Sequence, residues 1–201
     1  MNKWVIGARV KTLPAAVSPV LIGTFYASEV NWINALLALI VSLSLQIAVN
    51  YANDYSDGIR GTDTDRVGPI RLVASGLASA KSVKRASYIS FLFAVVAGSL
   101  LSLNISLWLI PVGGISILAA WGYTGGKQPY GYLGFGEFSV FIFFGLVATV
   151  GSYYVQSEQL NWQILLLSVP VGLLSCAILV INNLRDLPKD ALVSKRTVAV
   201  R

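Results

Sequence analysis

The sequence predicts an all-α protein, a polytopic bundle of about six transmembrane helices in a single domain over residues 1–201. The mean hydropathy is +0.69, and only 12% of the residues are charged, whereas soluble domains carry about 25% charged residues. Long apolar runs alternate with short polar segments. The chain has one Cys and no His, which argues against a disulfide framework and excludes histidine-based metal sites.

Each apolar run approaches the length of a membrane-spanning helix, which needs about 20 residues. Such runs must be helical in lipid, because unpaired backbone groups find no water there. The first run is short and contains two prolines. We therefore expect it to tilt, or to continue from an interfacial helix at residues 4–9. In chain order, the runs occupy residues 13–27, 33–49, 86–103, 107–123, 138–155 and 164–181.

The segments between the runs alternate in charge. All fifteen Lys and Arg residues fall in the N-terminal segment or in segments 54–85, 122–137 and 182–201. The intervening segments hold Glu29 and Glu158 but no basic residue. By the positive-inside rule, we expect the basic segments on the cytoplasmic side of the cell inner membrane. The net charge of +6 then reflects topology, and no nucleic-acid partner is expected.

Polar residues gather where the second apolar run ends, in "NYANDYSDGIRGTDTDRVGPIR". Asn50, Asp54 and Asp57 are spaced i, i+4, i+7, which places them on one face of a helix. Gln46 lies one turn earlier on the same face. Polar side chains at the end of a membrane span usually face a bundle interior or a water-filled cavity.

A second acidic cluster, "NNLRDLPKD", follows the sixth run. Asn183, Asp186 and Asp190 repeat the helical spacing of the first cluster. An even number of crossings separates the clusters, so both emerge on the same side. If the second and sixth helices are neighbours, the acids face one another across a cavity. In a helix, Pro188 would remove a backbone donor and clash with the preceding turn, so we expect the helix to end near Asp186.

Carboxylates without His or Cys suit a hard cation, most simply Mg²⁺, which is commonly held by one or two carboxylates plus substrate phosphates. A pair of such ions between the clusters would bridge a diphosphate, and nearby basic side chains would neutralise its remaining charge. A diphosphate beside a lipid-embedded cavity indicates an isoprenoid donor, whose tail can lie in the apolar space.

These motifs resemble those of the UbiA superfamily of membrane prenyltransferases, which carry paired Asp-rich motifs at the ends of two helices. The corresponding stretches here are "NDYSD", with a further Asp at position 63, and "DLPKD". Within the superfamily, the chain is most similar to the 1,4-dihydroxy-2-naphthoate polyprenyltransferases, on the evidence of "RVKTLPAAVSPVLIGT", "YTGGKQPYGYLGFGE" and "NNLRDLPKDALVSKRTVAVR". Members of this family are usually longer, so the chain is expected to lack their C-terminal helices.

The resemblance implies Mg²⁺-dependent transfer of a polyprenyl group from a prenyl diphosphate to 1,4-dihydroxy-2-naphthoate, giving demethylmenaquinone. It assigns one Mg²⁺ to Asp57 and Asp63, with Asp54 assisting, and another to Asp186 and Asp190. Asp54, Asp57 and Asp186 are the expected catalytic residues. The expected substrate-binding residues are Asn50, Asn53, Arg66, Arg71, Lys127, Asn183, Arg185 and Lys195. Aromatic faces for the allylic cation are expected from Tyr51, Tyr55, Tyr123 and Tyr130.

Two alternatives remain open at this point. One is a prenyltransferase with another aromatic acceptor, such as 4-hydroxybenzoate. The other is a membrane transporter or lipid-binding protein, in which ionisable groups or broken helices would lie at the bilayer midplane. Here the charges gather at one mouth, which favours the enzyme.

Overall fold

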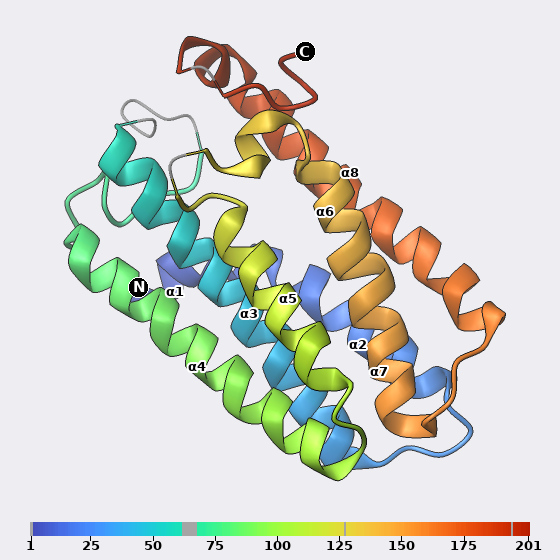
Figure 1. Ribbon diagram of the computed structural model, residues 1–201. Coiled ribbons are helices and arrows are strands. Elements are labelled where there is room, and N and C mark those ends of the chain that lie inside the picture. Colours follow the sequence, from blue (N-terminus) through green and yellow to red (C-terminus); the bar gives the residue numbers. More distant parts are fainter. Residues whose placement is uncertain (1, 62–67, 127, 194) are drawn as a thin grey trace.

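The structure is a computed structural model that describes residues 2–61, 68–126, 128–193 and 195–201. Within these residues every regular element is a helix, and there is no strand (Figure 1). This confirms the predicted all-α class. In chain order the elements are α1 (Lys3–Ala8), η1 (Val10–Thr12), α2 (Pro14–Tyr26), α3 (Trp32–Arg60), α4 (Ala80–Asn104), α5 (Leu109–Gly122), η2 (Tyr130–Leu133), α6 (Gly136–Val140), η3 (Phe141–Val147), α7 (Ala148–Ser157) and α8 (Trp162–Leu192).

All six predicted runs are helical, but they differ in length. Among the described residues, α3, α4, the continuous α6–η3–α7 segment and α8 are long and apolar enough to cross a membrane. The segment Lys3–Thr12 meets α2 at a 53° bend, and this pair adds a fifth span if the two helices are counted as one. This bend confirms the expected entry helix before the first run. The 14 residues of α5 extend only about 21 Å, less than the roughly 30 Å of a bilayer core.

Side-chain caps fix where the long helices begin. Asn31 caps α3, Ser79 caps α4 and Asn161 caps α8, each accepting hydrogen bonds from backbone N–H groups of the first turn. α3 ends at Gly61, which adopts φ 72° and donates its N–H back to the carbonyl of Asp57. This left-handed conformation favours glycine, so the end of α3 is defined by the sequence.

The expectation that the last helix ends near Asp186 is wrong. α8 continues through Pro188 to Leu192, so Asp190 is helical as well. Pro188 has no backbone N–H to donate, but it lies in the last turns of α8. The helix ends where the N–H of Val193 donates to the carbonyl of Lys189 at 3.3 Å. One missing bond so near the end does not stop the helix.

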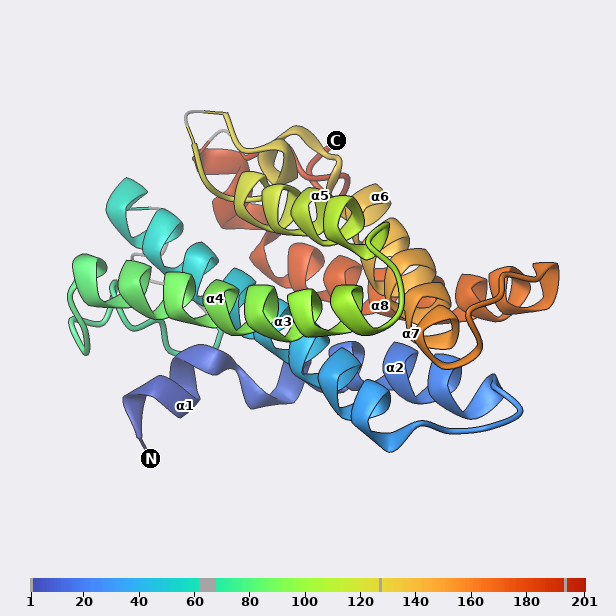
Figure 2. The same cartoon turned by 60° about the horizontal axis from the view of Figure 1, so that its bottom comes forward.

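The helices pack as a bundle around an open centre. α3 and α4 lie side by side along their lengths, α2 packs against α7, and α8 packs against η3 (Figures 1 and 2). At Gly23 in α2, a Cβ atom would lie 2.3 Å from the carbonyl oxygen of Thr149 in α7. The α2–α7 contact is therefore as close as glycine alone permits.

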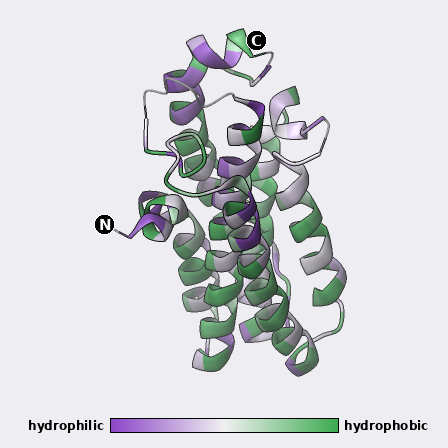
Figure 3. Cartoon of the chain, turned by 90° about the vertical axis from the view of Figure 1, so that its left-hand side faces the viewer, coloured by the Kyte–Doolittle hydropathy of each residue, from purple (hydrophilic) through white to green (hydrophobic). Residues whose placement is uncertain are grey.

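The outer surface of the bundle is apolar, as expected for a multi-pass membrane protein. Large side chains such as Leu103, Leu118 and Leu174 are about 70% exposed on the outside of their helices (72%, 73% and 69%), an arrangement suited to lipid. Hydrophilic residues concentrate at one end of the molecule (Figure 3). The C-terminal ends of α3 and α8 both lie at that end (Figure 1), so the two acidic clusters share one side of the bundle, as predicted.

Candidate functional site

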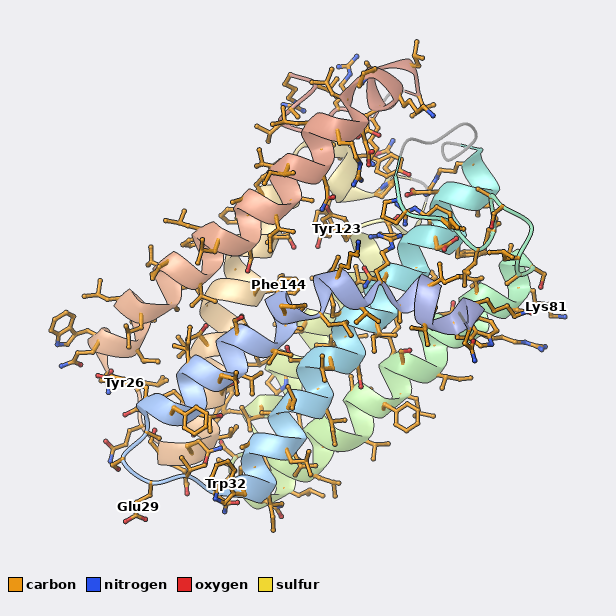
Figure 4. All side chains as sticks on the ribbon, turned by 180° about the vertical axis from the view of Figure 1, so that it is seen from behind. Tyr26, Glu29, Trp32, Lys81, Tyr123 and Phe144 are labelled. Carbon is orange, nitrogen blue, oxygen red and sulfur yellow. The ribbon has the colours of Figure 1, made fainter. Side chains whose placement is uncertain are left out.

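A mainly apolar cavity of about 330 Å³ lies at the centre of the bundle. Its deeper lining includes Val41 on α3, Leu101 on α4 and Phe144 on η3, while Asn53 lines its polar part. Figure 4 shows Tyr123, another lining residue, between the ends of α3 and α8. The cavity therefore offers an apolar space that becomes polar near the acidic clusters.

The predicted polar face of α3 is buried. Gln46, Asn50, Asp54 and Asp57 are all 9% exposed or less. The Nδ2 group of Asn50 donates to the carbonyl of Ala8 at 2.9 Å, so this amide ties α3 to the N-terminal helix. Burial of the whole face confirms the prediction from the helical spacing.

Asp54 holds the chain that follows the first motif. Its Oδ2 accepts the backbone N–H of Leu72 at 2.8 Å, and its Oδ1 accepts that of Val73 at 3.1 Å. The side chain is fully buried. Both carboxylate oxygens are thus engaged in positioning residues 72 and 73, which directly follow Arg71.

Asp57 lies one turn further along α3 and meets two other segments. Its Oδ2 lies 3.7 Å from Nη2 of Arg71, and its Oδ1 accepts a short hydrogen bond from the hydroxyl of Tyr132. Arg71, which the sequence assigned to substrate binding, is itself 8% exposed. The structure therefore brings the acid and this predicted basic contact together.

The second cluster lies on α8 and in the segment after it. The Nδ2 group of Asn183 donates to Oε1 of Glu137 at 3.0 Å. Arg185 binds both oxygens of Asp186, at 2.8 and 2.9 Å, and Lys195 lies 3.3 Å from Oδ1 of Asp190. Each predicted acid of this cluster therefore has a basic partner within it.

The loop between α5 and α6 joins the two clusters. The ring of Tyr132 lies 5.3 Å from the guanidinium of Arg60 and 5.3 Å from Nζ of Lys195. Burial raises the pKa of the Tyr123 hydroxyl above its ordinary value, and the charges of Asp57 and Asp190 add to the rise. Tyr123 therefore stays a neutral hydroxyl within the electrostatic reach of both clusters.

The donor atoms at this end of the cavity suit a hard cation. Within the described residues no three His, Cys, Asp or Glu side chains form a group that could hold a metal. Among the described residues, three buried amide or carboxylate oxygens nevertheless lack a hydrogen-bond partner: Asn53 Oδ1, Glu137 Oε2 and Asp190 Oδ2. Mg²⁺ needs only one or two carboxylates when a substrate phosphate completes its shell, so the residues fit Mg²⁺ shared with a diphosphate.

Three predicted site residues, Asp63, Arg66 and Lys127, lie outside the described residues. Of the predicted aromatic residues, Tyr123 and Tyr130 line the cavity. By contrast, the hydroxyl of Tyr51 donates to the carbonyl of Trp4, and the ring of Tyr55 lies 5.2 Å from Nζ of Lys84.

The sequence interpretation missed two residues of this site, Tyr132 and Glu137. Both lie in the stretch "PYGYLGFGE" after the fourth apolar run, Tyr132 in η2 and Glu137 in the first turn of α6. The only signal there was the density of glycine and aromatic residues, which marks a compact loop but does not say what the loop contacts.

Comparison with known proteins gives a consistent result. Residues 16–201 match the model of the UbiA prenyltransferase family. The chain is 54% identical over 202 residues to a 1,4-dihydroxy-2-naphthoate octaprenyltransferase of Mycobacterium tuberculosis, covering 99% of this chain and 69% of the relative. It is 39% identical to the Escherichia coli enzyme of the same name, with coverages of 98% and 68%.

The fold is also similar to that of a solved structure of digeranylgeranylglyceryl phosphate synthase in membranes. The TM-score is 0.72 at 18% identity, and the match covers 98% of this chain and 67% of that chain. At this identity the likeness supports the arrangement of the helices alone.

Proposed function

The chain belongs to the UbiA prenyltransferase family, and from this premise we propose that it transfers a polyprenyl group from a prenyl diphosphate to 1,4-dihydroxy-2-naphthoate, giving demethylmenaquinol, the hydroquinone form of demethylmenaquinone. The acceptor is proposed from the similarity to enzymes named for it, at 54% identity over 99% of this chain. The structural observation that carries the proposal is the meeting of two acidic clusters beside an apolar cavity within the bundle.

Members of this family generally use Mg²⁺. Asp57, Asp186 and Asp190 are the residues we propose to hold it, together with Asp63, which lies outside the described residues. When bound, Mg²⁺ would neutralise the diphosphate and stabilise it as a leaving group.

Basic side chains beside the acids are placed to bind the diphosphate. Arg71 and Lys195 each already contact an acid of one cluster, and their N–H groups can form charge-assisted hydrogen bonds to phosphate oxygens. The two residues approach from different segments, so a diphosphate between them would be held from both sides and its C–O bond directed toward the cavity.

The cavity then serves the organic part of the reaction. Its apolar lining excludes water from the allylic cation that remains when the C–O bond breaks, and the rings of Tyr123 and Tyr130 face this space. The electron-rich naphthoate ring attacks the cation. The ring carbon that gains the prenyl group loses its carboxylate as CO₂, so the charges balance and the ring keeps both hydroxyl groups as a hydroquinone.

The C-terminal ends of α3 and α8, which carry the acidic clusters with Arg60 and Lys189 in their last turns, lie at one end of the molecule (Figure 1), where hydrophilic residues concentrate (Figure 3). By the positive-inside rule, we place this end at the cytoplasmic face of the cell inner membrane. Both the donor diphosphate and the naphthoate carboxylate would then meet the site from the cytoplasm, while the isoprenoid tail lies in the bilayer.

The test is a product assay on membranes that contain the full chain. With 1,4-dihydroxy-2-naphthoate, a prenyl diphosphate and Mg²⁺, we expect demethylmenaquinol, detected as demethylmenaquinone after oxidation in air, and EDTA should stop its formation until Mg²⁺ is restored. The matched control is 4-hydroxybenzoate in place of the naphthoate. Prenylation of 4-hydroxybenzoate alone would overturn the proposed acceptor, and no prenylated product with either acceptor would overturn the proposed reaction.

A further inference from the structure

We propose that Tyr132 is a positioning residue that holds the two acidic clusters at a fixed separation and orients Asp57 for the metal–diphosphate complex. The inference rests on the proposed function and adds to it a residue that belongs to neither acidic motif. Tyr132 lies in η2, on the loop between α5 and α6.

The hydroxyl of Tyr132 orients the first cluster. It donates to Oδ1 of Asp57, while Oδ2 of the same carboxylate faces Arg71 at 3.7 Å. With each oxygen held by a different group, the carboxylate plane of Asp57 is fixed. The Asp57 side chain is also buried, so no competing contact with bulk water loosens this arrangement.

The ring of Tyr132 contacts the second cluster. Nζ of Lys195 lies 5.3 Å from the ring centroid and also 3.3 Å from Oδ1 of Asp190. A continuous chain of side chains thus runs from α3 to the end of α8: Asp57, Tyr132, Lys195 and Asp190. Arg60 of α3 also lies 5.3 Å from the ring, which adds a second attachment to α3.

The backbone around Tyr132 is held tightly, so its side chain can serve as a fixed spacer. Its carbonyl accepts the N–H of Arg196 at 2.9 Å, and the N–H of Gly131 binds the carbonyl of Tyr123 at 3.0 Å. A Cβ at position 131 would lie 2.6 Å from that carbonyl oxygen, so only glycine allows this close approach. Arg60 secures the same loop by donating to the carbonyl of Thr124 at 2.9 Å.

These contacts predict a specific effect of removing one oxygen atom. In Tyr132→Phe the ring remains beside Arg60 and Lys195, but Asp57 loses the hydrogen bond from the Tyr132 hydroxyl to its Oδ1. Asp57 can then rotate, so metal binding weakens because the carboxylate must be ordered again when the ion arrives. Once the complex has formed, the chemical step proceeds much as before.

The experiment measures metal binding directly. The full chain in detergent is titrated with Mn²⁺ alone, and free Mn²⁺ is followed by electron paramagnetic resonance. We expect Tyr132→Phe to weaken Mn²⁺ binding about tenfold, the scale of one hydrogen bond to a charged group. We also expect the Mg²⁺ concentration for half-maximal activity to rise by a similar factor while kcat changes less than about twofold.

Tyr153→Phe is the matched control. It also removes a hydroxyl from a buried tyrosine, one that accepts a hydrogen bond from Asn161 at 2.9 Å, far from the acidic clusters. Its Mn²⁺ affinity should equal that of the wild type. Asp57→Asn identifies the site, because it should remove the tightest Mn²⁺ binding altogether.

The outcomes separate this inference from the proposed function. If Asp57→Asn loses Mn²⁺ binding but Tyr132→Phe binds as the wild type does, the positioning role of Tyr132 is wrong and the metal site stands. If Tyr132→Phe and Tyr153→Phe weaken binding equally, the effect is general destabilisation and the inference is again overturned. Absence of Asp57-dependent Mn²⁺ binding in the wild type would overturn the metal site and, with it, this role.

Discussion

Replacing Asp54 by Asn tests whether the two aspartates of the first motif have different tasks. Asp54 is fully buried and accepts the N–H groups of Leu72 at 2.8 Å and Val73 at 3.1 Å. An Asn side chain has one oxygen, so one of these buried donors would face an NH₂ group instead. Leaving a buried donor unsatisfied costs about 1–3 kcal/mol, and at roughly 2–4 °C per kcal/mol for a chain of this size the melting temperature should fall by about 2–12 °C.

The melting temperature can be followed by size-exclusion chromatography of heated samples in detergent. Limited proteolysis provides a local measure, because the segment that carries Leu72 and Val73 should be cut faster in Asp54→Asn. The control is Asp186→Asn, which loses a partly exposed pair with Arg185 worth no more than about 1 kcal/mol. If Asp54→Asn melts within about 1 °C of the wild type, the anchoring role derived from its hydrogen bonds is wrong.

Three further predictions concern other parts of the molecule. Gly23→Ala should lower the melting temperature because its Cβ would lie 2.3 Å from the carbonyl oxygen of Thr149. Gly151→Ala, with no atom within 4 Å of the new Cβ, should leave the melting temperature unchanged or raise it. Equal melting temperatures of the two variants would contradict the close α2–α7 contact. Arg60→Gln should speed proteolysis between α5 and α6 by removing two hydrogen bonds to that loop, and an unchanged cleavage pattern would argue against that restraint. Asp186→Ala should abolish prenyl transfer while membrane insertion, measured by alkaline extraction, stays intact; near-normal activity would remove this residue from the site.

Sequence periodicity predicted the acidic face of α3 well, because a long helix fixes the relative direction of residues four and seven apart. It could not separate Asp54 from Asp57. Both residues are aspartates on the same face of α3, and they differ only because the backbone N–H groups of residues 72 and 73 bind Asp54. The local sequence around α3 does not predict this contact with a later segment.

The wrong end of α8 and the omission of Tyr132 have related causes. The end of α8 was placed too early because a proline was judged on local grounds, whereas the missing donor costs little in the last turns of a 31-residue helix. Tyr132 was missed because its position depends on distant contacts, with Arg60 on one side and Arg196 on the other. Helix patterns carry such information poorly, since each contact joins segments far apart in the chain.

The site also explains how two acidic clusters can persist beside an apolar cavity. Each cluster acid that the structure describes has a partner within the protein: Asp54 has backbone N–H groups, Asp57 has Arg71, Asp186 has Arg185, and Asp190 has Lys195. These pairs reduce the repulsion between the clusters. A divalent cation must compete with these basic groups for the carboxylates.

Binding of the cation and the diphosphate should therefore be cooperative. A diphosphate that draws Arg71 and Lys195 to its own oxygens frees Asp57 and Asp190, and the freed carboxylates then bind the cation more tightly. By reciprocity, the cation strengthens diphosphate binding by the same factor. Inorganic pyrophosphate added during a Mn²⁺ titration should increase the affinity for Mn²⁺ beyond the effect of the Mn²⁺–pyrophosphate complex in solution. The increase in Mn²⁺ affinity should disappear in Arg71→Gln, which lacks the positive charge that the diphosphate attracts. An equal increase in that variant would show that Arg71 does not leave Asp57 to bind the phosphate.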